Sequence, residues 1–305
     1  MRIICDTKLL SAAVIGLTLI AVPSIARSAP ATEEGRAYTL EGTQVWSVPD
    51  PRSGRLYEVF VSLPASYAHE PERRYPVLYV ADADYGFPLI RSITRRINLD
   101  GPVTEEFILV GLSYAKGEDG MTSRRRDYTP TIRGGEGAPK KAVHGQGAQY
   151  QRYLRDQVLP FVERKFRADP GRRVFMGHSY GGLLGAQILL SEPQLFRDYI
   201  LGSPSFWYDN HVMWKIEADY AKAHRDLAAN VFLYVGAFEG VHPNDRRFNR
   251  NRDMVKDLQL FERRVMKRGY PGLRVKSEVL AGENHLTVFP SGFTRGLVHT
   301  LPAQP

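Results

Sequence analysis

The stretch Val174-Phe175-Met176-Gly177-His178-Ser179-Tyr180-Gly181-Gly182 decides the fold. An apolar run leads into Ser179, and a segment with small residues at Gly182, Gly185 and Ala186 leads away from it. This order predicts a strand, a sharp turn and a helix, which together lift a serine hydroxyl clear of a sheet. The glycines are needed because side chains would clash across such a turn. We therefore expect Ser179 to act as a nucleophile.

The segments on both sides of this stretch alternate between short apolar runs and helical patterns. Apolar runs typical of strands buried on both faces occur at residues 77–80, 107–110, 174–176, 199–201, 231–235 and 275–280. Helical patterns occur at residues 87–98, 147–167, 181–191, 252–268 and 288–299. The alternation predicts an α/β fold with a mostly parallel, twisted sheet that helices cover on both faces. Residues 37–47 and 55–63 predict an antiparallel start.

The composition fits one globular domain. Of the 305 residues, 43% are hydrophobic and 24% are charged, which excludes disorder and a collagen-like fibre. Lys and Arg outnumber Asp and Glu by 41 to 33, and the resulting formal charge of +8 attracts anionic ligands. We expect a single domain at residues 36–305, in which residues 115–146 form a long loop of the kind that is functional or disordered.

The amino terminus resembles a secretory signal. Two basic residues precede a mostly apolar stretch at residues 9–22, and small residues follow. We expect a signal peptide at residues 1–26, with cleavage as late as residue 31 or an uncleaved anchor as alternatives, and then a disordered mature terminus at residues 27–35. After cleavage we expect no stable membrane insertion and a periplasmic or secreted location. Cys5, the only cysteine, lies in the signal, which excludes disulfides and thiolate chemistry from the mature protein.

A serine hydroxyl needs a base to take its proton, and in such a fold the base comes late in the chain. His285 fits because it lies just past the last predicted strand, well downstream of Ser179. An acid between the two should orient the imidazole. Glu239, the first carboxylate after the preceding strand, is our candidate. Asp245 and Asp253 are its rivals, and a serine and histidine pair without an acid is the remaining alternative.

The oxyanion that forms in acyl transfer needs two preorganised amide donors. One is expected from Tyr180, the residue after the nucleophile, and the other from the loop after the strand at residues 77–80. In that loop we favour the amide of Asp84, with Ala83 as the alternative. His178 points away from the serine hydroxyl on a tight turn, and we expect it to line the substrate site.

Five short motifs follow one another along the chain, YPVLYVAD at 75–82, RDYTPT at 126–131, GHSYGG at 177–182, SPSFW at 203–207 and GENH at 282–285. In this order they resemble the putative-esterase family of α/β-hydrolases, which includes esterase D, feruloyl esterases, mycolyltransferases and the periplasmic trilactone siderophore esterases. The siderophore esterases are the nearest match. The resemblance covers residues 36 to about 300 and implies the α/β-hydrolase fold and an esterase activity. Ala83 departs from the glycine common in the family's oxyanion loop, and the loop at 115–146 carries its own glycine cluster.

The substrate is predicted from basic and aromatic side chains. Arg124, Arg125 and Arg126, together with Trp207, would combine anion attraction with a flat aromatic surface if their loops meet over Ser179. An anionic or catecholate ester would suit such a site. The alternative is that the arginines form a solvated loop and that the aromatic residues cap the core.

These observations predict a serine esterase that hydrolyses a small-molecule carboxylic ester through an acyl-enzyme on Ser179. The reaction requires neither a metal nor a cofactor. An acyltransferase and a catalytically inactive binding protein of the same fold are the alternatives. No zinc motif or recognition-helix pattern supports a nucleic-acid partner, and the oligomeric state is left open.

Overall fold

The computed structural model describes residues 35, 37–134 and 137–303. The predicted signal peptide, with Cys5, lies outside the described residues, as does nearly all of the segment at residues 27–35. Two units are distinguished, Met1–Thr39 and Leu40–Pro305, and the second contains the fold described below.

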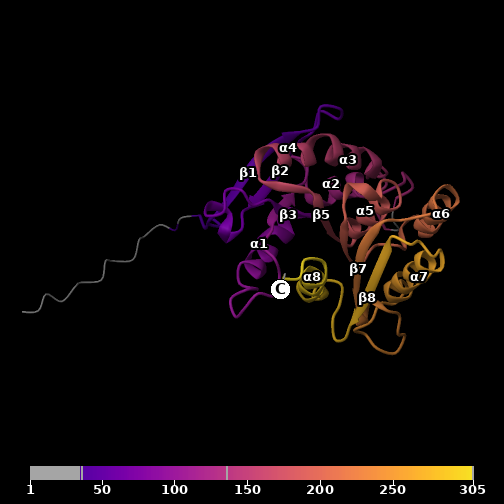
Figure 1. The fold of residues 1–305 in the computed structure, drawn as a ribbon. Coiled ribbons are helices and arrows are strands. Elements are labelled where there is room, and N and C mark those ends of the chain that lie inside the picture. The colour runs from indigo at the N-terminus through magenta and orange to yellow at the C-terminus, as the bar shows by residue number, and fades with distance from the viewer. Residues whose placement is uncertain (1–34, 36, 135–136, 304–305) are drawn as a thin grey trace, which may run out of the picture. The chain divides into compact units, whose positions relative to one another are not determined.

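The described residues form one eight-stranded sheet in the order β1-β2-β4-β3-β5-β6-β7-β8 (Figure 1). The strands are β1 (Thr43–Pro49), β2 (Leu56–Ser62), β3 (Tyr75–Val80), β4 (Ile108–Leu112), β5 (Ala168–His178), β6 (Asp198–Gly202), β7 (Ala229–Gly236) and β8 (Leu273–Leu280). β2 pairs antiparallel with β1 and with β4, and every other pair in the sheet is parallel. This topology confirms the predicted α/β fold class, a mostly parallel sheet with an antiparallel start.

Helices cover both faces of the sheet (Figure 1). They are α1 (Ala83–Thr94), α2 (Gly120–Asp127), α3 (Gly147–Tyr153), α4 (Leu159–Lys165), α5 (Tyr180–Leu189), α6 (Tyr208–Ala223), α7 (Met254–Lys267) and α8 (Val288–Thr300). Because successive side chains of a strand point to opposite faces, β3 contributes to two cores. Leu78 and Val80 pack in the core under α1 and α8, whereas Val77 and Tyr79 pack in the core that α3, α4 and α5 cover.

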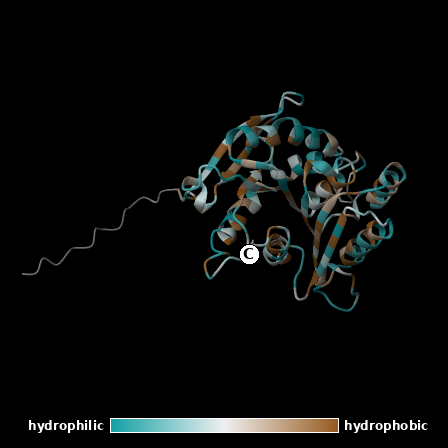
Figure 2. Cartoon of the chain, in the orientation of Figure 1, coloured by the Kyte–Doolittle hydropathy of each residue, from teal (hydrophilic) through white to brown (hydrophobic). Residues whose placement is uncertain are grey.

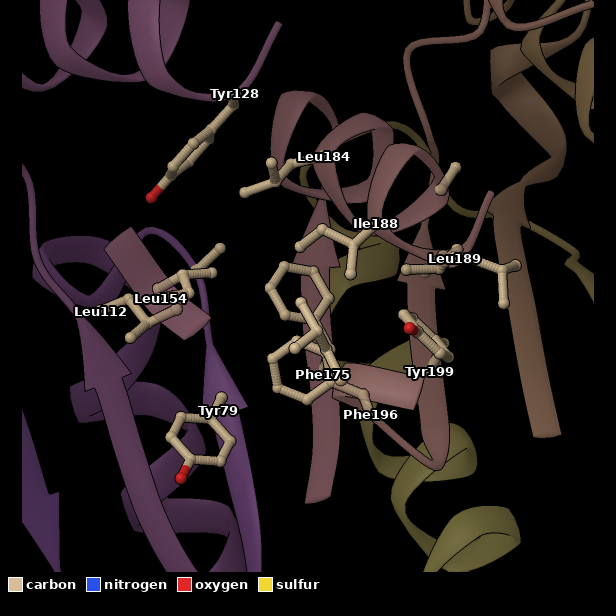
Figure 3. Packing of buried hydrophobic residues seen from close by; sticks show 14 of the residues in the cluster. Tyr79, Leu112, Tyr128, Leu154, Phe175, Leu184, Ile188, Leu189, Phe196 and Tyr199 are labelled. Atoms are coloured by element: carbon tan, nitrogen blue, oxygen red, sulfur yellow. The ribbon is translucent and has the colours of Figure 1, made fainter. Parts of the chain in front are cut away.

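Tight packing between β5 and α5 holds the turn that carries Ser179. Figure 2 shows hydrophobic residues along the inner strands, and Figure 3 shows Leu184 and Ile188 of α5 near Phe175 of β5. Gly185 lets this helix approach the sheet, since a Cβ at that position would lie 2.8 Å from the Phe175 ring. The start of α5 is therefore fixed against the end of β5.

The helix predicted at residues 147–167 is interrupted. α3 passes into a π-helical turn, Leu154–Val158, before α4 begins. Pro160 lies in the first turn of α4 and has no N–H to donate to the carbonyl four residues earlier. The Leu159 amide instead bonds to the Leu154 carbonyl, five residues back, so the chain continues as a helix with one wide turn.

The loop predicted at residues 115–146 contains a helix, α2, which corrects that prediction. α2 has no apolar periodicity, and its charged run gave no helical pattern. The helix is held instead by its ends: the Asp119 side chain accepts a hydrogen bond from the Thr122 amide at 3.0 Å and caps the first turn. Ion pairs from Arg124 and Arg126 fix its second half.

Candidate active site

Ser179 lies at the sharp turn between β5 and α5. Its backbone has φ 60° and ψ −117°, a strained conformation for a residue with a side chain. Close backbone approach explains the neighbouring glycines: a Cβ at Gly177 would lie 2.2 Å from the Gly181 carbonyl oxygen. A Cβ at Gly182 would lie 2.9 Å from the Gly202 carbonyl oxygen, which also accepts the Ser179 amide at 2.9 Å. The turn raises the serine side chain at the carboxyl edge of the parallel strands.

Ser179 and His285 line the same cavity, whose volume is about 580 Å³. The Ser179 Oγ lies 3.4 Å from the Oγ of Ser205, which also lines the cavity. Within the described residues no hydrogen bond joins Ser179 to His285. Catalytic hydrogen bonds are often long without substrate, and a rotation about χ1 of the serine would move its hydroxyl from one partner to another.

Glu239 holds the imidazole of His285. The Glu239 Oε2 lies 2.6 Å from His285 Nδ1, and its Oε1 accepts hydrogen bonds from Ser203 Oγ at 2.6 Å and from the Gly236 amide at 2.9 Å. The glutamate is only 1% exposed. A carboxylate can only accept here, so the neutral ring of His285 carries its proton on Nδ1, which is the tautomer whose Nε2 can act as a base.

The two rival carboxylates are engaged elsewhere. The Asp245 carboxylate pairs with Arg247 at 2.6 Å, and hydrogen bonds from that side chain and its amide lower the pKa of Asp245 to about 2. Asp253 caps α7, where its Oδ1 accepts the Lys256 amide at 2.9 Å. Of the three carboxylates that the sequence left open, Glu239 is the one that the structure brings to His285.

His178 contacts the loop that carries His285. Burial, and then the neighbouring His285, lower the pKa of His178 well below 6.5, so its ring is neutral at pH 7. Its Nε2 lies 2.8 Å from the His285 carbonyl oxygen and must therefore carry the proton. Its Nδ1 is then the acceptor for the Tyr234 hydroxyl, at 3.5 Å. His178, expected to line the substrate site, is not among the residues that line the cavity.

The amides predicted to bind an oxyanion lie at the starts of two helices. Tyr180 is the first residue of α5, and Ala83 and Asp84 are the first two residues of α1. The two starts adjoin, because a Cβ at Gly181 would lie 3.3 Å from the Asp82 carboxylate. First-turn amides have no acceptor within their own helix, and the helix dipole makes this end positive. The arrangement therefore suits a developing negative charge.

The three consecutive arginines do not line the cavity. Arg124 forms a bidentate ion pair with Asp82, with N···O distances of 3.0 and 3.1 Å. Arg126 is buried and pairs with Asp127 at 2.8 Å and with Glu118. Arg125 is half-buried on the same helix. Carboxylates of the same chain thus neutralise the guanidinium groups of Arg124 and Arg126, whereas the prediction gave all three arginines a role in binding an anionic substrate.

A different group of basic residues lines the cavity. Beyond Ser179, Ser205 and His285, the lining includes Trp207, Asn249, Arg250, Asn251, Arg252 and Met254. The Arg252 guanidinium lies over the Trp207 ring, 3.9 Å from its centroid. Trp207 was predicted at the site, but the two arginines were missed because residues 249–252 belong to no motif and no periodic segment. In the sequence, only their position shortly after Glu239 indicated that these arginines lie near the site.

Within the residues that the structure describes, no group of three or more His, Cys, Asp or Glu side chains could hold a metal ion. Over the same residues, none of the helices combines the length and the apolar character that crossing a bilayer needs.

Known proteins resemble this chain in sequence and in fold. The sequence model of the family described as "Putative esterase" matches residues 51–268. The ferri-bacillibactin esterase BesA of Bacillus subtilis is 28% identical over 277 residues, covering 86% of this chain and 90% of that protein. The siderophore enterobactin esterase of Emericella nidulans is 29% identical over 178 residues, covering 54% of this chain and 58% of that protein. The BES protein of Bacillus cereus has a solved structure with a TM-score of 0.74 and 24% identity, covering 89% of this chain and 99% of that one. The chain therefore belongs to the putative esterase family, and it is a hydrolase with the α/β fold described above.

Proposed function

We propose that this chain is a secreted serine esterase that hydrolyses an anionic siderophore ester in the cavity over Ser179. One observation carries the proposal: the cavity is lined both by Ser179, on its strained turn, and by His285, whose Nδ1 is bound to the buried Glu239. A serine, a carboxylate and a histidine in this order along the chain form the triad of acyl-transfer enzymes of this fold.

The proposed reaction has two halves. Ser179 Oγ attacks the ester carbonyl while His285 Nε2 takes its proton, and the C–O bond of the ester breaks as His285 returns that proton to the leaving alcohol. Water then attacks the acyl-enzyme while His285 takes its proton, the bond between the acyl carbon and Ser179 Oγ breaks, and His285 returns the proton to Oγ as the acid product leaves. The amides of Tyr180 and Asp84, or of its neighbour Ala83, hold the oxyanion in both halves.

The cavity wall supports an anionic, aromatic substrate. Arg250 and Arg252 add positive charge beside Ser179, and the indole of Trp207 adds a flat apolar face. A catecholate ester has the matching properties, because its rings stack on flat side chains and its phenolate oxygens attract guanidinium groups. The formal net charge of +8 would also steer an anionic substrate toward the protein.

The names of the two sequence relatives support the same substrate class. One is called a ferri-bacillibactin esterase and the other a siderophore enterobactin esterase. We therefore propose a catecholate trilactone siderophore, with or without bound iron, as the ester. The iron would be cargo of the substrate and take no part in the protein's chemistry.

The proposed location rests on the amino-terminal sequence. A cleaved signal peptide would release a periplasmic or secreted enzyme whose mature chain begins at Arg27 or, with late cleavage, at Thr32. Amino-terminal sequencing of the protein recovered from the cell envelope or the culture medium tests this, and an intact residue 1 on all recovered protein would contradict it.

The activity is tested with purified mature protein and four substrates: ferric and iron-free enterobactin, ferric bacillibactin and a neutral aryl acetate. Liquid chromatography with mass detection should find the linear products of trilactone opening with the wild type and none above background with Ser179→Ala. Adding an alcohol acceptor distinguishes transfer from hydrolysis, since a transferase would form an acylated acceptor. Hydrolysis of the aryl acetate without opening of any trilactone would refute the substrate, and full activity of Ser179→Ala would refute the mechanism.

A further inference from the structure

We infer that the ion pair between Asp82 and Arg124 keeps the oxyanion-binding amides open and in place, which makes both residues positioning residues of the esterase reaction. This inference rests on the proposed function. It gives a role to the arginine-rich motif that the substrate cavity does not use, and it concerns the loop where Ala83 replaces the glycine common in the resembled family.

Asp82 is the residue before α1, and its side chain bonds to Tyr114 and Arg124 instead of capping that helix. An aspartate at this position usually caps the helix by accepting a hydrogen bond from a first-turn amide. Here Asp82 has φ 57° and ψ 45°, in the left-handed region, and its side chain makes no capping bond. The amides of Ala83 and Asp84 are therefore left for a ligand.

Three contacts hold Asp82 in this unusual conformation. The hydroxyl of Tyr128, a fully buried residue, accepts the Asp82 amide at 3.2 Å. Tyr114 donates its hydroxyl to Asp82 Oδ1 at 2.7 Å. Arg124 donates from Nε to Oδ1 at 3.0 Å and from Nη2 to Oδ2 at 3.1 Å. A left-handed conformation of a residue other than glycine persists only where its surroundings over-determine it, as they do here.

Arg124 also reaches the other half of the oxyanion site. Its guanidinium carbon lies 5.3 Å from the centroid of the Tyr180 ring, and Tyr180 is the residue whose amide is the second donor. Burial lowers the pKa of the Arg124 guanidinium, but the charge and hydrogen bonds of Asp82, together with Tyr114 and Tyr128, outweigh burial and raise the pKa. One charged side chain therefore contacts a residue at each of the two helix starts.

The charge of Arg124 matters as much as its position. The Asp82 carboxylate lies next to the start of α5, 3.3 Å from where a Cβ of Gly181 would be. Without Arg124 a carboxylate with no ion pair would remain beside the developing oxyanion. Only the Tyr114 hydroxyl, at 2.7 Å from Oδ1, would then keep the Asp82 side chain from turning back to cap the α1 amides. Both effects oppose the transition state, the first by like-charge repulsion and the second by occupying the donors.

Three variants should differ in kcat on an aryl acetate. Arg124→Gln leaves the carboxylate unpaired, and we expect kcat to fall about 100-fold, the size of losing one oxyanion donor. Asp82→Asn removes the negative charge while keeping a hydrogen-bonding side chain, and we expect a fall of about tenfold. The double variant Asp82→Asn with Arg124→Gln should be about tenfold faster than Arg124→Gln, because the harmful carboxylate is gone. KM should change little in all three.

Arg173→Gln is the matched control. Arg173 Nε lies 2.8 Å from Glu163 Oε1. The two ion pairs are similarly buried, since the side chains of Arg173 and Glu163 are 19% and 26% exposed and those of Arg124 and Asp82 are 16% and 12% exposed. Arg173 lies in the middle of β5, away from the end of the strand that leads into Ser179. Arg173→Gln should therefore lose stability without losing kcat. A purely structural role of Arg124 would make the double variant as slow as Arg124→Gln or slower, and that result would overturn the inference. So would a kcat of Arg124→Gln within twofold of the wild type.

Two further measurements keep the test decisive. If Arg124→Gln does not fold, Asp82→Asn alone is compared with the wild type in its affinity for an alkyl boronic acid, which forms a tetrahedral adduct on the serine. That affinity should fall in parallel with kcat/KM, and an unchanged boronate affinity would overturn the inference. Fluorophosphonate labelling of Ser179 in the wild type separates the two proposals: without labelling the proposed function fails, and with labelling but unaffected variants only the role of the ion pair fails.

Discussion

Replacing Glu239 with glutamine should disable the base without disturbing the fold. The Glu239 Oε1 accepts from the Gly236 amide at 2.9 Å and from Ser203 Oγ at 2.6 Å. In Glu239→Gln the side-chain carbonyl oxygen must take this place, because the Gly236 N–H can only donate. The new amide nitrogen then faces His285 Nδ1, which the wild-type carboxylate approaches to 2.6 Å.

The magnitude follows from the tautomer of the imidazole. A facing N–H turns His285 Nδ1 into an acceptor, so the ring proton moves to Nε2, the atom that should receive the proton of Ser179. Loss of the correct tautomer in a serine triad lowers kcat by about 10⁴ in the best-known case, and we expect about 10³ to 10⁴ here. At 1.36 kcal/mol for each tenfold change, the barrier rises by about 4 to 5.5 kcal/mol. With Glu239 only 1% exposed, water cannot readily substitute for the carboxylate.

The assay is steady-state hydrolysis of an aryl acetate at pH 7 to 8, with thermal melting of each variant as the folding control. Asp245→Asn is the matched control, since this half-buried carboxylate pairs with Arg247 rather than with His285. This variant should leave kcat within twofold of the wild type. The reasoning is refuted if folded Glu239→Gln retains more than a tenth of wild-type kcat, or if Asp245→Asn loses as much activity as Glu239→Gln.

Three further predictions follow from the same contacts. Arg250→Ala should raise KM about tenfold for a ferric catecholate substrate at low salt and leave the KM for the neutral aryl acetate within twofold of the wild type. Equal effects on the two substrates would contradict this prediction. Arg225→Ala, at an exposed arginine that does not line the cavity, is the charge-matched control. His178→Ala removes the donor to the His285 carbonyl oxygen and should lower kcat about tenfold with little change in KM, and a changed KM at constant kcat would contradict it. Burial lowers the pKa of His144 and of His178 below 6.5, so as the pH falls below about 6.5 the unfolded chain binds protons that the folded chain does not. The free energy of unfolding, measured by urea titration from pH 7.5 to 5.5, should therefore fall by up to about 1.4 kcal/mol per pH unit for each histidine, and a rise over that range would contradict it.

The sequence was sufficient where local pattern and chain order decide the structure. The apolar run before Ser179 and the small residues after it predicted the strand, turn and helix that the structure contains. The order of strands also placed His285 and Glu239 after successive parallel strands, whose carboxyl ends share one edge of the sheet. The structure brings these two side chains into contact, although their catalytic roles stay predictions.

The remaining features depend on contacts that no local pattern encodes. Arg124 looks like part of a solvated basic run in the sequence, yet its carboxylate partner, Asp82, is 42 residues away along the chain. The helix that carries Arg124 has no apolar stripe, so its existence depends on an end cap and on ion pairs. Arg250 and Arg252 reach the cavity through an irregular segment after Glu239, and such segments have no periodicity to predict their direction.

Covalent labelling at Ser179 tests the central claim most directly. Purified mature protein is incubated with a fluorophosphonate, and intact mass and peptide mapping locate the adduct. The account predicts one phosphonyl group per chain, located on the peptide that contains Ser179, and no adduct on Ser179→Ala. A wild-type protein that opens an ester substrate yet stays unlabelled, or a label located on another residue and retained by Ser179→Ala, would contradict the account.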